Sequence, residues 1–313
     1  MRGLELCRGF FEECGRPMLE AQFPELLPLL AAGLLGSGSE CFGFDDEVSR
    51  DHDFEPGFCL FLPGEETVDR RTAFQLERAY ARLPKEYGGV VRGGLAPVGG
   101  PRHGVFRTAE FFSALVGTPD GSLSTDGWLT VPEQGLAEAV NGAVFFDGPG
   151  QVTAIRAALA YYPEDVRRKK LAGELLLMGQ SGQYNYRRCL LHGETGAAQL
   201  AVAEFVKSAM HAIFLLNRRY EPYYKWSFRA MRALPLLSAE ADSLEFLLCT
   251  DNGEEMAEEK YYAMEDLAAR VITVLQDQGL TQAVCGDLEK HAYSVNDGIR
   301  NSELRTRHIL SAV

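Results

Sequence analysis

Two short apolar runs, joined by a polar stretch, place the strongest constraint on how this chain folds. Residues 30–35 form the first run, residues 58–62 form the second, and alternating glycine and serine occupy residues 36–39 between them. Short apolar runs that are bounded by turn residues are typical of buried β-strands. The order therefore predicts a strand, a glycine turn, a polar loop and a second strand.

The loop before the second predicted strand carries two aspartates, Asp51 and Asp53. In an extended chain, residues two apart point to the same side, so both carboxylates would share one face, roughly 6–7 Å apart. Carboxylate oxygens at that spacing suit Mg²⁺, which takes one or two protein carboxylates and completes its shell with phosphate oxygens and water. We expect Asp51 and Asp53 to be metal ligands, with Mg²⁺ (or Mn²⁺) as the ion.

The glycine turn has the composition of a phosphate-binding loop. Gly36 and Gly38 allow the main chain to come close to a ligand, and Ser37 and Ser39 add hydroxyl groups. A bland alternative is that the serines only stabilise the turn. Metal carboxylates beside such a turn are the groups that phosphoryl or nucleotidyl transfer requires.

These residues also carry a resemblance to a known family. Gly38-Ser39, followed after eleven residues by Asp51-His52-Asp53, resembles the motif of the DNA polymerase β-like nucleotidyltransferase superfamily, which includes the aminoglycoside nucleotidyltransferases. Further segments resemble a bacterial branch known only as a domain of unknown function: residues 126–129, 132–134, 141–147, 162–166 and 220–226. The resemblance covers most of the chain, from the glycine turn to about residue 234.

The resemblance implies a third carboxylate and a lysine from the helical half of the protein. The third acid would be a metal ligand or the base that activates the attacking hydroxyl. The predicted third strand, residues 105–108, has no acid. Asp147, which follows an apolar run, is the first candidate, and Glu110 and Asp126 are alternatives. Lys225 is the lysine that would reach the triphosphate.

Three further interpretations concern residues outside the turn. Arg187 is a candidate for a phosphate clamp, although arginines beside tyrosines are common on protein surfaces. Lys169 and Lys170 are expected to lie on a solvated helix face. His52, between the two aspartates, is expected to be structural.

Periodicity predicts an α+β protein of two domains. Residues 1–160 would form a small mixed β-sheet flanked by helices, and residues 161–313 an all-helical bundle. Residues 88–104, rich in glycine and proline, are expected to form a loop or hairpin. Helices are predicted at residues 2–20, 23–32, 69–83, 110–116, 136–140, 164 onward, 197–219, 224–234, 256–278 and 281–292.

Composition limits the partners and the compartment. A net charge of −13 argues against nucleic acid as a partner and favours a cationic second substrate. No apolar run approaches the ~18 residues of a membrane span, and the first residues include an acid where a signal peptide has its apolar core. The seven cysteines are scattered and without C-x-x-C spacing, so reduced thiols are expected. We therefore expect a cytoplasmic protein without a membrane partner.

These observations predict a Mg²⁺-dependent nucleotidyltransferase. It would move a nucleoside monophosphate, AMP from ATP, to an acceptor that the sequence does not identify, with a small molecule as the expected class. Two alternatives stay open. One is a nucleotide-binding regulator or antitoxin-like partner with little or no catalysis, and the other is a transferase that acts on a protein or a tRNA.

Overall fold

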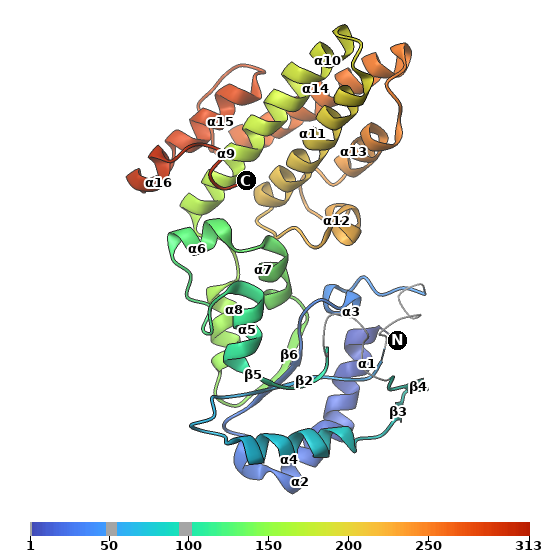
Figure 1. Ribbon diagram of the computed structural model, residues 1–313, viewed down its shortest axis with the longest axis vertical. Coiled ribbons are helices and arrows are strands. Elements are labelled where there is room, and N and C mark those ends of the chain that lie inside the picture. Colours follow the sequence, from blue (N-terminus) through green and yellow to red (C-terminus); the bar gives the residue numbers. More distant parts are fainter. Residues whose placement is uncertain (1, 48–54, 94–101) are drawn as a thin grey trace. The chain divides into compact units, whose positions relative to one another are not determined.

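The computed structural model describes residues 2–47, 55–93 and 102–313, and within them the chain forms two compact units. Unit 1 comprises Met1–Ser124 and Val131–Ala160, and unit 2 comprises Thr125–Thr130 and Tyr161–Val313. Unit 1 combines a sheet with helices, and unit 2 is helical (Figure 1). The α+β prediction is confirmed.

Unit 1 is built around a mixed sheet. Among the described residues, four strands pair in the order β5-β2-β1-β6, with β1 antiparallel to both neighbours and β2 parallel to β5. A separate hairpin pairs β3 with β4 and turns at Gly88 and Gly89, both at positive φ. The strands are β1 (Ala31–Leu34), β2 (Cys59–Leu62), β3 (Glu86–Tyr87), β4 (Val90–Val91), β5 (Gly104–Arg107) and β6 (Ala143–Asp147).

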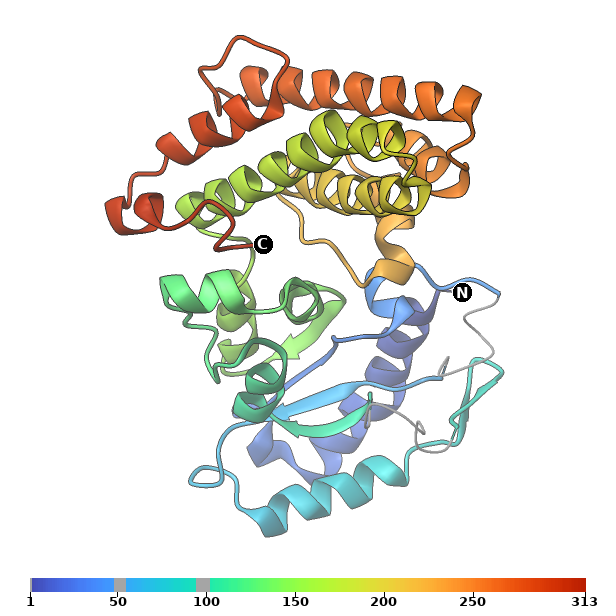
Figure 2. The same cartoon turned by 45° about the horizontal axis from the view of Figure 1, so that its top comes forward.

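Helices cover both faces of this sheet, with α1, α2 and α4 on one side and α5 and α8 on the other (Figures 1 and 2). The helices of unit 1 are α1 (Gly3–Phe10), the π-helix η1 (Phe11–Gly15), α2 (Arg16–Gln22), the 3-10 helix η2 (Pro24–Leu26), α3 (Ser39–Phe42), α4 (Arg70–Ala81), α5 (Thr108–Val116), α7 (Glu133–Val140) and α8 (Gln151–Ala158).

The middle strand β2 shows why the sheet is covered twice. Leu60 and Leu62 belong to the core that Phe10, Leu19 and Leu76 of α1, α2 and α4 complete. Phe61 points to the opposite side, because alternate strand residues do, and its ring lies 5.0 Å from that of Phe111 on α5. A strand that is buried on both faces needs apolar residues at every position, which explains the uninterrupted run in the sequence.

Unit 2 is a bundle in which α9 packs against α11 and α15. α9 continues through a second π-helix, η4, into α10. The elements are α6 (Thr125–Thr130), α9 (Glu164–Met178), η4 (Gly179–Tyr186), α10 (Arg187–Leu191), α11 (Thr195–Leu216), α12 (Tyr224–Met231), α13 (Glu240–Cys249), α14 (Glu254–Asp277), α15 (Leu288–Asp297) and α16 (Ser302–Thr306).

Helix α11 is the one helix in the described residues that is long and apolar enough to cross a membrane. However, 61% of its most apolar window is buried inside the protein. Val202, Phe205 and Ile213 of this helix are fully buried. Burial of this kind is what the core helix of a soluble protein shows.

Three of the secondary-structure predictions are wrong in part. Residues 23–32 do not form an α-helix. Only Pro24–Leu26 are helical, as the 3-10 helix η2, because Pro28 lacks the N–H that an α-helix would use, and β1 begins at Ala31. Residues 281–287 are not helical either, because α15 begins only at Leu288, where the Asp287 side chain accepts a hydrogen bond from Glu289 N. The predicted N-terminal helix is interrupted by the π-helix η1.

The prediction that Lys169 and Lys170 lie on a solvated face is also wrong. Both side chains are buried, with 0% and 5% exposed. Lys169 Nζ donates to Asn296 Oδ1 at 2.9 Å and to Arg307 O at 2.7 Å. Lys170 Nζ donates to Ala312 O at 3.2 Å. The burial of each ammonium group is thus offset by carbonyl or amide oxygens of the C-terminal segment.

Candidate functional site

The glycine turn follows the central strand β1 directly. β1 ends at Leu34, the turn occupies residues 36–39, and α3 begins at Ser39. Gly36 has φ +113°, a conformation that residues with a side chain rarely adopt. Gly38 is the N-cap of α3. The turn thus lies at one end of the sheet and leads into the first N–H groups of a short helix.

Asn141 holds this turn in place. Its Oδ1 accepts a hydrogen bond from Gly36 N at 3.0 Å, and its Nδ2 donates to Gly36 O at 2.7 Å. Arg156 supports Asn141 in turn, because its Nη1 donates to Asn141 O at 2.6 Å. The side-chain amide therefore satisfies both backbone groups of the residue where the turn begins.

Gly142 brings the segment before β6 into direct contact with the backbone on either side of the glycine turn. Its N–H donates to Cys41 O at 2.8 Å, and a Cβ at this position would overlap Leu34 O. Gly142 also has φ +58°, which favours glycine. The Asn141-Gly142 pair, 105 residues further along the chain from Gly36, is therefore the second half of the turn structure.

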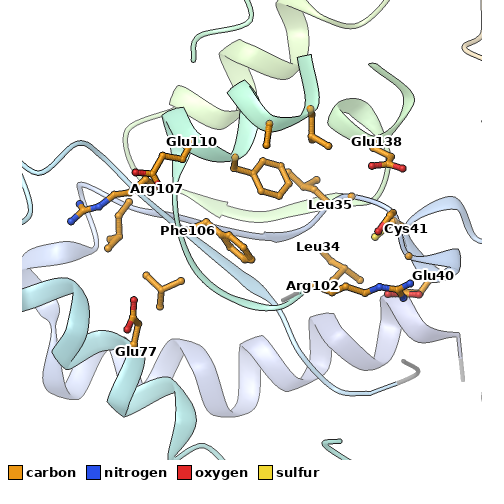
Figure 3. Close-up of a pocket in the computed structure, with 18 of the residues that line it drawn as sticks. Leu34, Leu35, Glu40, Cys41, Glu77, Arg102, Phe106, Arg107, Glu110 and Glu138 are labelled. Atoms are coloured by element: carbon orange, nitrogen blue, oxygen red, sulfur yellow. The ribbon is translucent and has the colours of Figure 1, made fainter. Parts of the chain in front are cut away.

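A cavity of about 490 Å³ opens at this turn (Figure 3). Pockets of this size hold small molecules of nucleotide dimensions. It lies within unit 1 and is bounded by the turn and by α3, α4, α5, α7, β2 and β5. Its lining consists of Leu34, Leu35, Gly36, Ser37, Gly38, Glu40, Cys41, Leu62, Ala73, Glu77, Arg102, Val105, Phe106, Arg107, Glu110, Phe111, Ala114, Leu115 and Glu138.

The charged groups of the cavity gather at its two ends. At one end, the side chain of Arg102 is directed toward Glu40, whereas Glu110 and Arg107 lie at the other end (Figure 3). Arg107 is held there because its Nη1 donates to Pro63 O at 2.7 Å. Glu138 accepts a hydrogen bond from Gln134 at 2.8 Å.

Glu40 and Glu138 are buried acids that sequence reasoning missed. They are 5% and 8% exposed. The Glu40 carboxylate folds back over the turn, so that a Cβ on Gly38 would overlap it, and its Oε2 lies 3.5 Å from Ser39 Oγ. Glu40 follows the glycine turn immediately in the sequence, which could have drawn attention to it, whereas nothing local distinguishes Glu138.

The cysteines near the turn are not nucleophiles. Burial raises the pKa of Cys7 and of Cys59 to about 12, and it raises the pKa of Cys41 as well. These thiols stay protonated at neutral pH, and a thiol attacks as its thiolate. Their contribution to this end of unit 1 is therefore packing.

The four residues of the glycine turn lie at or beside the cavity. Gly36, Ser37 and Gly38 line the cavity, and Ser39 begins α3 beside Glu40. Asp51 and Asp53, together with His52, lie outside the described residues. Within residues 2–47, 55–93 and 102–313, no group of three or more histidines, cysteines or acids is arranged to hold a metal ion.

The three candidates for a third carboxylate lie in different parts of the structure, and one of them lines the cavity. Asp147 pairs with Ala31 at the start of β1, so it lies at the end of the sheet opposite the turn. Its Oδ2 accepts a hydrogen bond from Thr153 N at 2.8 Å, close to the start of α8. Asp126 belongs to unit 2 and forms an ion pair with Arg307. Glu110 lines the cavity.

Lys225 and Arg187 both belong to unit 2, whereas the cavity is in unit 1. Arg187 Nη2 donates to Glu258 Oε1 at 2.8 Å, and its guanidinium lies 3.8 Å from the centre of the Tyr261 ring. Lys225 Nζ lies 5.0 Å from the Trp226 ring. Arg187 is therefore part of an ion pair between helices of the bundle.

Comparison with known proteins gives one family match. The model of a family described as "Domain of unknown function (DUF4037)" matches residues 128–227, which include segments of both units. No curated protein and no solved structure gives a significant match to this chain.

Proposed function

We propose that this protein is a Mg²⁺-dependent nucleotidyltransferase that transfers AMP from ATP to a small-molecule acceptor. The observation that carries the proposal is the glycine turn, which Asn141 fixes at both backbone groups of Gly36 and which opens onto a cavity of about 490 Å³. A preorganised turn with exposed N–H groups is suited to hold phosphate oxygens.

Specific groups of the turn are available to a phosphate. The N–H groups of Ser37 and Ser39 donate to none of the described residues. The Ser37 hydroxyl likewise has no partner among the residues that the structure describes. These donors would bind the β- and γ-phosphates, and Arg102 at the same end of the cavity would add positive charge (Figure 3).

Asp51 and Asp53 are the proposed metal ligands. In the sequence they precede Glu55 by four and two residues, and β2 follows. Because Cys59 pairs with Gly33, β2 starts at the same end of the sheet at which β1 ends and the glycine turn begins. Two carboxylates suit Mg²⁺, and the bound ion would neutralise negative charge on the α-phosphate.

The reaction would be an in-line displacement at the α-phosphorus. A hydroxyl oxygen of the acceptor forms a bond to this phosphorus, the bond from the phosphorus to the bridging oxygen breaks, and pyrophosphate leaves. The hydroxyl proton needs an acceptor, and Glu110 and Glu138 are carboxylates that line the cavity. Lys225 is proposed as a further contact to the triphosphate.

A nucleotide-binding regulator is the second candidate. The observation that favours it is the strand β5, which carries Arg107 where a catalytic carboxylate would be expected. Such a protein would bind ATP through the same turn but would not release pyrophosphate. In either case we place the protein in the cytoplasm, because all seven cysteines are free thiols.

Release of pyrophosphate from ATP tests the proposal. The wild-type protein, incubated with Mg²⁺, labelled ATP and a panel of hydroxyl and amine acceptors, should release pyrophosphate and label one acceptor class. Asp51→Ala should abolish release, whereas Asp147→Asn, at the opposite end of the sheet, should keep it. Binding of ATP without release in any condition would favour the regulator, and equal release by Asp51→Ala would refute the metal assignment.

A further inference from the structure

A second cavity lies within unit 2, at the N-terminus of α9. Its volume is about 480 Å³. Glu164, Arg167 and Arg168 contribute from α9, and Arg218 contributes from the segment after α11. Among the described residues that line it there are three guanidinium groups and one carboxylate. This local excess of positive charge contrasts with the net charge of −13 of the whole chain.

All three guanidinium groups meet at the Glu164 carboxylate. Arg167 binds it with two hydrogen bonds, from Nε at 3.0 Å and from Nη2 at 2.8 Å. Arg168 Nε donates to it at 3.1 Å, and Arg218 Nη2 donates at 2.7 Å. One negative charge is therefore shared among three positive charges, and its oxygens are saturated with donors.

Two of the three arginines keep donors for another partner. An arginine side chain has five N–H groups. Arg168 and Arg218 each use one of them on Glu164, and neither makes another hydrogen bond to the described residues. The side chain of Arg218 is 55% exposed, that of Arg168 is 19% exposed, and Arg167 is buried. The outer two guanidinium groups thus remain available at the cavity.

The backbone holds Arg218 in this position. Its φ of +51° is uncommon for a residue other than glycine. Its N–H donates to Leu215 O at 3.3 Å, just beyond the C-terminus of α11. Beside the arginines, the cavity is lined by the apolar residues Leu216, Pro235, Leu236 and Leu280.

We propose that this cavity binds a small organic phosphate. The phosphate group would lie against Arg168 and Arg218, since the planar fork of a guanidinium matches two phosphate oxygens. The organic part would lie against Leu216 and Leu236. Arg167 and Glu164 act as positioning residues that keep the outer arginines in place. The proposal is independent of the site in unit 1.

Calorimetric titration with phenyl phosphate tests this site in the full chain. The wild-type protein should bind phenyl phosphate saturably, inorganic phosphate more weakly, and phenol without detectable affinity. Arg218→Ala should weaken binding of phenyl phosphate at least roughly tenfold, and Arg218→Lys, which keeps the charge but loses the fork, should fall between the two.

Two controls separate this site from other arginines and from the glycine turn. Arg187→Ala removes another exposed arginine of unit 2 that pairs with one glutamate, and it should bind phenyl phosphate as the wild type does. Ser37→Asp, in unit 1, should also leave this affinity unchanged. Equal affinity of Arg218→Ala and the wild type, loss of binding in Ser37→Asp, or absence of saturable binding by the wild type would each overturn the proposal.

Discussion

Asn141 contacts the backbone of Gly36 through both polar atoms of its side-chain amide. Few side chains can do this, because the side chain needs a donor and an acceptor bonded to the same carbon. Without the amide, the N–H and C=O of Gly36 would lose their partners in a partly buried place. At the scale of single residues, the geometry of the proposed phosphate site therefore depends on an amide that belongs to a different part of the sequence.

Replacement of Asn141 tests this dependence. Asn141→Ala should lower the free energy of unfolding by about 1–3 kcal/mol, because two backbone groups lose their hydrogen bonds. It should also weaken ATP binding. Asn141→Asp keeps an acceptor for Gly36 N, but its ionised carboxylate would face Gly36 O and add negative charge beside the proposed phosphate site, so it should also weaken ATP binding. Urea denaturation and ATP titration measure both quantities, and an unchanged unfolding free energy in Asn141→Ala would contradict the assigned role.

At the scale of elements, the ion pairs of Glu164 at the N-terminus of α9 make the stability of the fold depend on pH. Burial alone would raise the pKa of Glu164, but the hydrogen bonds and charges of Arg167 and Arg218 outweigh burial and lower this pKa from 4.5 to about 2. A carboxyl group with a lowered pKa stabilises the folded state while it is ionised. Its contribution is therefore complete above pH 4.5 and disappears as the pH falls toward 2.

The acid sensitivity of the protein should reflect this group. Between pH 4.5 and pH 2, the thermal midpoint of Glu164→Gln should fall less steeply than that of the wild type, because the glutamine side chain does not take up a proton in this range. Glu258→Gln, which removes an exposed glutamate that pairs with Arg187, should follow the wild type more closely. Circular dichroism at several pH values measures these slopes. Parallel slopes for Glu164→Gln and the wild type would show that the ion pairs at α9 do not contribute.

Elements with a local signal could be predicted from the sequence. β2 is an uninterrupted apolar run because it is buried on both faces, and the glycine turn is recognisable from its composition. The strand β5 and the helix α5 follow from the run at residues 104–107 and the helical pattern after it. The helix predicted at residues 23–32 was wrong, however, because Pro24 and Pro28 interrupt the apolar stretch. The last two residues of that range, Ala31 and Ala32, belong to β1.

At the scale of the whole molecule, the features that sequence reasoning missed depend on distant partners. Lys169 is buried because Asn296 and Arg307, 127 and 138 residues away, supply oxygens for its ammonium group. The link from Gly36 to Asn141 spans 105 residues. No local pattern carries such information. The cavity of unit 1 also depends on residues that are far apart in the sequence, because its lining comes from the turn, α3, α4, α5, α7, β2 and β5.

The two units divide the chemistry of the chain between them. Unit 1 holds the glycine turn and its cavity, and unit 2 holds the arginine cavity. The match to the family model begins at residue 128 and ends at residue 227, so it covers Asn141 and Arg218 but not the glycine turn. The triphosphate of the proposed reaction binds at the turn of unit 1.

The affinity for ATP of a variant with an added charge in the turn tests that central claim most directly. Ser37→Asp places a carboxylate among the donors proposed for the β- and γ-phosphates, whereas Ser113→Asp places one at an exposed position of α5 in the same unit that does not line the cavity. In calorimetric titrations with Mg²⁺ present, Ser37→Asp should bind ATP at least roughly tenfold more weakly than the wild type, because like charges repel at close range. Ser113→Asp should bind within about twofold of the wild type. Equal ATP affinity of Ser37→Asp and the wild type would contradict phosphate binding at the glycine turn.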